Sequence, residues 1–224
     1  MSFSNVKNLI RKDIALLLHP TVILFFILAG GMLFIPDYPR SVGFFYIVIG
    51  IMNIFTLSLQ YKDHEASSLF PVQKRESVLA RVLLTAAVEL AVLVFTVPFT
   101  LLAHKLISGL DIANKAGMNL NITLYAIVLI GYGIYNLTVI PAGYTKQFKV
   151  YVRSFVGMGL YLIVTVALEN LVCRPKGGKL FLNGTSPAEL TRQLPFLLGA
   201  LAVFLIVNAI AYFIASRRYE NAEI

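Results

Sequence analysis

The chain is organised around residues 61–81, which read YKDHEASSLFPVQKRESVLAR. This stretch is the longest polar interruption in the N-terminal half, lies between long apolar segments, and carries seven of the chain's 30 charged residues. Its first part predicts a short amphipathic helix with Ala66, Leu69 and Phe70 on one face. Pro71 ends this helix, because the residue before a proline is disfavoured in the α region. A polar helix between two membrane spans can bind another protein, and the alternative is an ordinary solvated loop.

The composition indicates a membrane protein. The chain has 224 residues, of which 58% are hydrophobic and only 13% are charged, and its mean hydropathy is +0.79. Soluble domains carry about 25% charged residues, so a bilayer must solvate the excess apolar side chains here. The single cysteine, Cys173, excludes an intrachain disulfide and a multi-cysteine metal site. The net charge is +8, and the basic residues lie beside apolar segments. This arrangement favours a role in membrane topology over nucleic-acid binding.

Six apolar segments approach the ~20 residues that cross ~30 Å of hydrocarbon. We therefore predict an all-α polytopic membrane protein, one transmembrane domain over residues 1–224, with spans at about 21–36, 42–60, 78–104, 122–140, 152–172 and 194–215. Before the first span, the helical spacing over 3–18 predicts an amphipathic helix in the membrane interface, with an apolar face made by Phe3, Val6, Ile10, Ile14 and Leu17.

The distribution of positive charge predicts the orientation. The N-terminus, residues 61–81, residues 141–153 and the C-terminus hold 12 Lys or Arg, against seven in the opposite loops. Positive residues favour the cytoplasmic side, so we expect both termini and residues 61–81 in the cytoplasm. The outer loop at 173–193 contains Ser186-Pro187-Ala188-Glu189, a capping box that predicts a short helix before the last span, bent near Pro195.

No stretch has the composition of a catalytic site. The chain contains no G-x-x-x-x-G-K-[ST] phosphate loop, and its three histidines, His19, His64 and His104, are scattered. We therefore expect no catalytic residue, no metal site and no cofactor in this chain.

Polar side chains within the spans are candidates for a translocation pathway. A carboxylate in the middle of a span costs about 2.5–3.5 kcal/mol on insertion scales, so Glu89 is expected to face the protein interior or a water-filled cavity. The candidates lie on the third and fifth spans and are Thr85, Glu89, Thr96, Tyr161, Thr165 and Glu169. The alternative for these residues is helix–helix packing through interhelical hydrogen bonds.

The order of elements and one motif are similar to a known family. Phe70-Pro71-Val72-Gln73-Lys74, followed by Val78-Leu79-Ala80-Arg81, is similar to the Leu-Pro-Val-Ser/Thr-Arg/Lys segment that opens the third span in permeases of ABC-2-type transporters, with departures at Phe70 and Gln73. The chain most resembles the small peptide exporters of that family, such as those for phenol-soluble modulins.

This resemblance implies an ABC-2 exporter-type fold, and a four-subunit complex of two permeases and two cytoplasmic ATPase subunits. ATP and Mg²⁺ would bind the ATPase and not this chain. Residues 62–70 would be the coupling helix, with Leu69 and Phe70 as buried anchors and Asp63 and Glu65 as rim charges beside Lys62. The substrate would be an amphipathic peptide or another hydrophobic molecule, moved through a bacterial plasma membrane.

Two other functions fit the same residues. One is a proton-coupled secondary transporter that uses Glu89 as its relay, although the chain has no internal repeat of the kind common in that class. The other is a membrane-embedded assembly or immunity protein that transports nothing.

Overall fold

A computed structural model describes residues 2–63, 67, 71–109, 117–144, 147–173 and 180–221. Over these residues the chain is all-α, without a strand. Its elements are α1 (Phe3–Leu17), α2 (Thr21–Met32), α3 (Val42–Gln60), α5 (Lys74–Gly109), α6 (Ile122–Val139), η1 (Ile140–Ala142), α7 (Gln147–Cys173), η2 (Leu180–Leu182) and α8 (Pro187–Glu220). The predicted all-α polytopic fold is confirmed.

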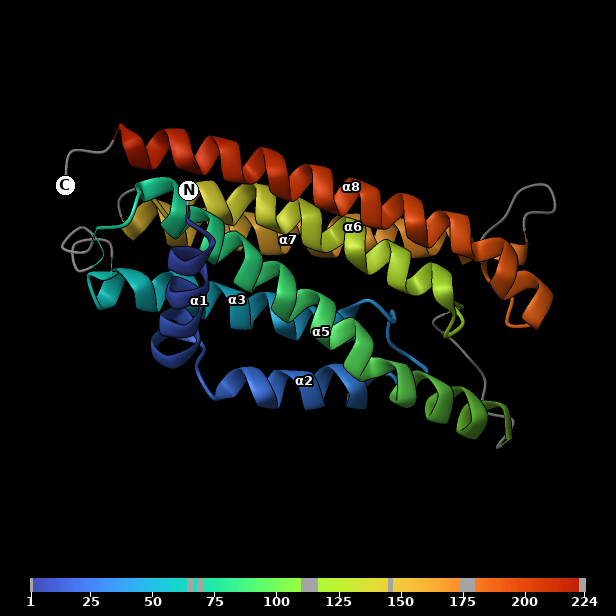
Figure 1. The fold of residues 1–224 in the computed structure, drawn as a ribbon. Coiled ribbons are helices and arrows are strands. Elements are labelled where there is room, and N and C mark those ends of the chain that lie inside the picture. Colours follow the sequence, from blue (N-terminus) through green and yellow to red (C-terminus); the bar gives the residue numbers. More distant parts are fainter. Residues whose placement is uncertain are drawn as a thin grey trace.

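The long helices form one bundle, and α6 lies at its centre (Figure 1). Helices α7 and α8 both pack on α6, and α2, α3 and α5 form the other half of the bundle. Both termini lie at the same end as the last turn of α3 and the first turn of α5 (Figure 1). Helix α1 lies across this end, at 83° to α2.

The first predicted span, 21–36, is shorter than expected. Helix α2 has 12 residues, which extend about 18 Å, whereas the hydrocarbon core is ~30 Å thick. After its C-terminal end the chain continues in turns with hydrogen bonds between residues three apart, such as Ile35 N–H to Met32 O. Gly30-Gly31 weakens the helix at this point. Five helices of the described chain can therefore span a membrane alone, and a sixth span requires α1 and α2 together.

The last span and the predicted outer helix are one element. Helix α8 runs from Pro187 to Glu220 and includes Pro195, which does not end it. The predicted capping box is present: Ser186 N–H donates to Glu189 Oε2 at 3.1 Å, and Glu189 N–H donates to Ser186 Oγ at 3.4 Å. The first turns of α8, orange in Figure 1, run at an angle to its long axis.

Helix α1 packs on the first turns of α5. Val6 and Leu9 contact Ala80 in a small apolar cluster, and Glu76 of α5 accepts hydrogen bonds from Ser2 N–H and from the Asn5 amide. The apolar face that we predicted for α1 is rotated from the buried one: the buried residues are Val6, Leu9, Asp13 and Leu17. Phe3 and Ile14, both predicted on the apolar face, are exposed at this end of the bundle.

Helices α6 and α7 approach closely at glycines. A Cβ atom on Gly131 of α6 would lie 2.5 Å from Thr165 Cγ2 and 2.8 Å from Tyr161 Cδ2 on α7. Close approach of backbones at small residues is a main source of helix association in membranes, where lipid gives no hydrophobic driving force. Gly159 of α7 faces open space, since a Cβ there would have no neighbour within 4 Å.

We predict that Gly131→Ala destabilises the bundle by about 1–3 kcal/mol, because the new methyl group overpacks the α6–α7 contact. Thermal unfolding in detergent measures the effect. Gly159→Ala is the matched control, and it should be neutral or stabilising by up to about 1 kcal/mol through helix propensity. Equal behaviour of the two variants would show that the contact at Gly131 is not tight.

Candidate functional site

The end of the bundle that carries both termini holds a buried cluster of four charged side chains. Lys12 and Asp13 come from α1, Asp63 from the segment after α3, and Arg81 from α5. We call these four residues the ion cluster. It joins three segments that are far apart in the sequence, and one of them opens the stretch 62–70 in which we predicted the coupling helix.

Arg81 is the centre of the ion cluster. Its side chain is 1% exposed, its Nε donates to Asp13 Oδ2 at 2.8 Å, and its Nη2 donates to Asp63 Oδ2 at 2.9 Å. The planar guanidinium thus binds two carboxylates with two different nitrogens, which fixes both in direction. The guanidinium also lies 5.9 Å from the ring centroid of Phe55 on α3.

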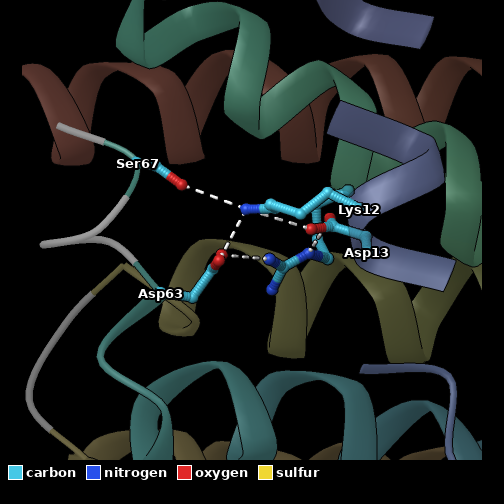
Figure 2. Close-up of polar contacts among 5 residues, drawn as sticks. Lys12, Asp13, Asp63 and Ser67 are labelled. Atoms are coloured by element: carbon cyan, nitrogen blue, oxygen red, sulfur yellow. Dashed lines mark hydrogen bonds and ion pairs between the residues drawn. The ribbon is translucent and has the colours of Figure 1, made fainter. Parts of the chain in front are cut away.

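Lys12 connects the ion cluster to residues 63 and 67 of the segment that follows α3. Its amine lies 2.5 Å from Asp63 Oδ1, 3.4 Å from Asp13 Oδ1 and 3.0 Å from Ser67 Oγ. Figure 2 shows the Lys12 amine between these three side chains. Each carboxylate therefore has two cationic neighbours, and the two positive charges balance the two negative ones. This balance offsets the cost of removing the charges from water.

The backbone after α3 directs Asp63 into the ion cluster. Helix α3 ends at Gln60, and Lys62 adopts a left-handed conformation with φ 51°, the geometry that ends many helices. Lys62 N–H donates to Leu59 O at 3.2 Å, so the chain reverses tightly before Asp63. Buried Tyr144 lies beside the ion cluster: burial raises the pKa of its hydroxyl, and the positive charge of Arg81 opposes this increase.

The outcome for the predicted coupling residues is mixed. The prediction that Asp63 is a rim charge is wrong, because it is 4% exposed and pairs with two cations inside the protein. Glu65, Leu69 and Phe70 lie outside the described residues. Sequence analysis missed Lys12, Asp13 and Arg81 as partners. One signal was present: Asp13 continues the spacing of the buried α1 residues Val6, Leu9 and Leu17, so an acidic side chain sits on an apolar face.

A second polar cluster lies inside the membrane-spanning part. Glu89 of α5, which is 0% exposed, accepts a hydrogen bond on Oε2 from Asn136 Nδ2 of α6 at 2.7 Å. The same amide lies 3.1 Å from Asn208 Oδ1 of α8, and Asn208 Nδ2 donates to Phe204 O. Glu89 thus faces the interior, as its cost in a bilayer requires. Asn208 was not expected, because one asparagine in an apolar helix gives no periodic signal.

The other candidates on α5 are Thr96 and Thr85, and both are buried. The Thr96 hydroxyl donates to Val92 O and Leu93 O within its own helix, and its Oγ1 lies 3.5 Å from the Tyr125 hydroxyl of α6. Thr85 is fully buried one turn before Glu89. Thr96 therefore reaches α6 through Tyr125, whereas Thr85 Oγ1 has no hydrogen-bond partner among the described residues.

The candidates on α7 hold the start of α3. Glu169 accepts hydrogen bonds from Arg40 N–H at 3.1 Å and Ser41 N–H at 2.5 Å, and the Tyr161 hydroxyl donates to Ser41 O at 3.1 Å. A carboxylate at a helix N-terminus satisfies free backbone donors and the helix dipole. The Thr165 hydroxyl donates to Tyr161 O within α7.

Arg40 completes this contact. It is 3% exposed and donates to Leu33 O and Ile35 O, both at 2.9 Å, although its position between two predicted spans is that of a loop charge. Burial lowers the pKa of its guanidinium, and the negative charge of Glu169 opposes that change. The turn between α2 and α3 is thereby fixed to α7.

All six predicted pathway residues are therefore enclosed by their own protomer. Their described hydrogen bonds lie within one helix, between helices or at a helix N-terminus, and a substrate can reach these side chains only after helices separate. A role in translocation stays a prediction.

We predict that Arg81→Gln destabilises the protein by about 3–5 kcal/mol, because it leaves Asp13 and Asp63 buried with one cation between them. The free energy of unfolding in mixed micelles measures the loss. Arg75→Gln is the control: Arg75 pairs with Glu220 at 2.5 Å, but the two side chains are 56% and 36% exposed, so its loss should leave the free energy of unfolding nearly unchanged. A small loss for Arg81→Gln would contradict a structural role for the ion cluster.

Comparisons with known proteins give the family. A family model described as ABC-2 family transporter protein matches residues 8–220. Comparisons with curated proteins and with solved structures gave no match. The family match covers the bundle from α1 to the end of α8, including the ion cluster and the polar cluster around Glu89. The chain belongs to the ABC-2 transporter family and is a multi-pass membrane permease subunit of an ABC transporter.

Proposed function

We propose that this chain is the permease subunit of an ATP-driven exporter in a bacterial plasma membrane, with both termini in the cytoplasm. The observation that carries the proposal is the ion cluster, because it holds the beginning of the 62–70 segment against α1 and α5. Members of the family pair with an ABC ATPase. ATP and Mg²⁺ would bind that partner, and this chain would supply the membrane pathway.

The coupling step follows from the contacts at residues 63 and 67. Asp63 and Ser67 both contact Lys12, and Asp63 also contacts Arg81. A displacement of this segment by the ATPase must therefore displace α1 and α5 with it, or break buried charge pairs at a cost of several kcal/mol. In this proposal Asp63 acts as an internal link and not as a rim charge. Leu69 and Phe70 remain the proposed anchors on the ATPase.

We propose that a second copy of the chain completes the permease and that the substrate is an amphipathic peptide. A polytopic bundle with a buried carboxylate suits a cationic amphipathic molecule, since Glu89 provides an acidic group inside the membrane. Glu89 Oε1 has no hydrogen-bond partner among the described residues, so packing alone does not account for a charged group here.

The coupling segment is tested by Phe70→Ala. If Phe70 inserts into a pocket of the ATPase, its loss removes buried aromatic area worth about 1–3 kcal/mol, and the ATPase should bind about 5- to 150-fold more weakly. Co-purification with a co-expressed candidate ABC ATPase, in detergent, measures binding. Tyr38→Ala is the matched control, because Tyr38 is an aromatic residue 52% exposed in the turn at the opposite end of the bundle. Unchanged binding of both variants identifies 62–70 as a solvated loop.

The carboxylate inside the bundle is tested by Glu89→Gln and Glu89→Leu. Glutamine preserves an acceptor for Asn136 Nδ2, so Glu89→Gln should fold normally and alter substrate-stimulated ATPase activity of the assembled transporter. Glu89→Leu leaves the Asn136 amide without this acceptor and should lose about 1–3 kcal/mol of stability. Wild-type transport by Glu89→Gln, together with misfolding of Glu89→Leu, would assign Glu89 to packing alone.

A further inference from the structure

A positively charged pocket opens at the end of the bundle that carries the termini. It has a volume of about 380 Å³ and lies between the first turns of α7, the last turn of α8 and the connection that follows η1. We call it the basic pocket, and its lining residues are Ala142, Tyr144, Lys149, Arg153, Arg218 and Asn221. It is separate from the ion cluster and is not used by the coupling mechanism proposed above.

Three cations and no carboxylate line the basic pocket among the described residues. Lys149 and Arg153 are one turn apart on α7, so their side chains project from the same helix face. Arg218 of α8 is held at the rim, where its Nη1 donates to Pro141 O at 3.1 Å. The acidic residue nearest in sequence to Arg218 is Glu220, and it pairs with Arg75 of α5. Among the residues that the structure describes, the lining of the pocket therefore carries positive charge and no negative charge.

The side chains that line the basic pocket also offer the hydrogen-bond donors that an anion needs. Two arginines offer planar sets of N–H donors, which suit phosphate oxygens, and Lys149 adds a compact charge. The side-chain amide of Asn221 provides a further donor. A phosphate group placed here would meet donors from two helices at once.

Exposed apolar helix faces continue from the basic pocket into the bundle's membrane-facing surface. On α7, Val156 and Leu160 lie on the face of Arg153 and are 51% and 38% exposed. On α8, Ile214 and Ile210 lie one and two turns before Arg218 and are 37% and 45% exposed. A ligand with a phosphate headgroup and apolar chains matches both parts of this surface, whereas a free anion or an acidic protein side chain uses only the pocket.

We propose that the basic pocket binds the phosphate group of an anionic membrane lipid, whose acyl chains lie along the apolar faces of α7 and α8. Basic pockets between transmembrane helices bind such headgroups, and anionic lipid is concentrated in the cytoplasmic leaflet, where we place this end of the chain. The inference depends on the chain being a membrane protein. It does not depend on the ATPase or on the transported substrate.

The test removes the three positive charges of the pocket. Lys149→Gln, Arg153→Gln and Arg218→Gln are combined in one variant, which is purified in detergent and titrated with dioleoylphosphatidylglycerol or dioleoylphosphatidylcholine under native mass spectrometry. Each basic residue near an anionic headgroup contributes about fivefold in binding. The triple variant should therefore bind phosphatidylglycerol at least about tenfold more weakly than the wild type, with phosphatidylcholine binding unchanged.

The matched control combines Lys7→Gln, Arg11→Gln and Arg217→Gln, which removes the same charge from exposed positions outside the pocket. This control should retain phosphatidylglycerol binding, as should a charge-preserving variant with Lys149→Arg, Arg153→Lys and Arg218→Lys. If the triple glutamine variant does not fold, the pair Lys149→Gln and Arg153→Gln replaces it, since both side chains are exposed.

Four outcomes overturn the proposal. Wild-type lipid affinity in the glutamine variants would show that the pocket binds no lipid. Equal loss in the control triple would show a general charge effect. Competition by inorganic phosphate at the affinity of the lipid would assign the pocket to a free anion. Unchanged lipid binding with weaker ATPase co-purification would identify a protein-docking surface.

Discussion

A buried guanidinium between two carboxylates determines how the end of this bundle is built. Arg81 cannot be removed from water without partners, since an isolated buried charge costs several kcal/mol. Its partners come from α1 and from the segment after α3, so α5 can adopt its position only when both segments are in place. The ion cluster therefore acts as a folding constraint as well as a mechanical link. The apolar contact of Val6 and Leu9 with Ala80 lies on the same α1–α5 interface and supports it.

Helix α3 is fixed at both ends by polar contacts of this kind. At its C-terminal end Asp63 enters the ion cluster, and at its N-terminal end Ser41 is held by Glu169 and Tyr161 of α7. The 19 residues of α3 extend about 28 Å as a rigid element between these two contacts. A displacement at residue 63 is therefore transmitted to α7 at the opposite end of the bundle. In the proposed function, this connection links residues 62–70 to the membrane-spanning helix α7.

Sequence analysis predicted the spans well and the polar contacts poorly, for a physical reason. Apolar length alone determines a membrane helix, so the spans corresponding to α3, α5, α6, α7 and α8 could be found from hydropathy. The start of α2 was predicted, but its end was placed too late, because the apolar residues continue through Gly30-Gly31 to Ile35 whereas the helix ends at Met32. Asp63 was predicted as an exposed charge, since neither of its partners, Lys12 and Arg81, lies within 15 residues of it in the sequence. Pairing between distant segments leaves no local pattern.

The contacts that α6 makes with its neighbours differ in how easily they can change. Helices α6 and α7 meet at Gly131, where there is no room for another methyl group, and such a contact is lost entirely when the helices part. Helix α5 meets α6 through the amide of Asn136 and the carboxylate of Glu89, and α8 meets α6 through Asn208. Hydrogen bonds of this kind can be exchanged for bonds to water at a net cost of about 0.5–1.5 kcal/mol each. The hydrogen bonds between α5 and α6 are therefore easier to exchange than the α6–α7 contact, and α5 is also the helix that carries Arg81 of the ion cluster. In the proposed transport cycle, separation of α5 from α6 would break the bonds that Glu89 and Thr96 make to α6, so these two buried polar groups would become available to a substrate together.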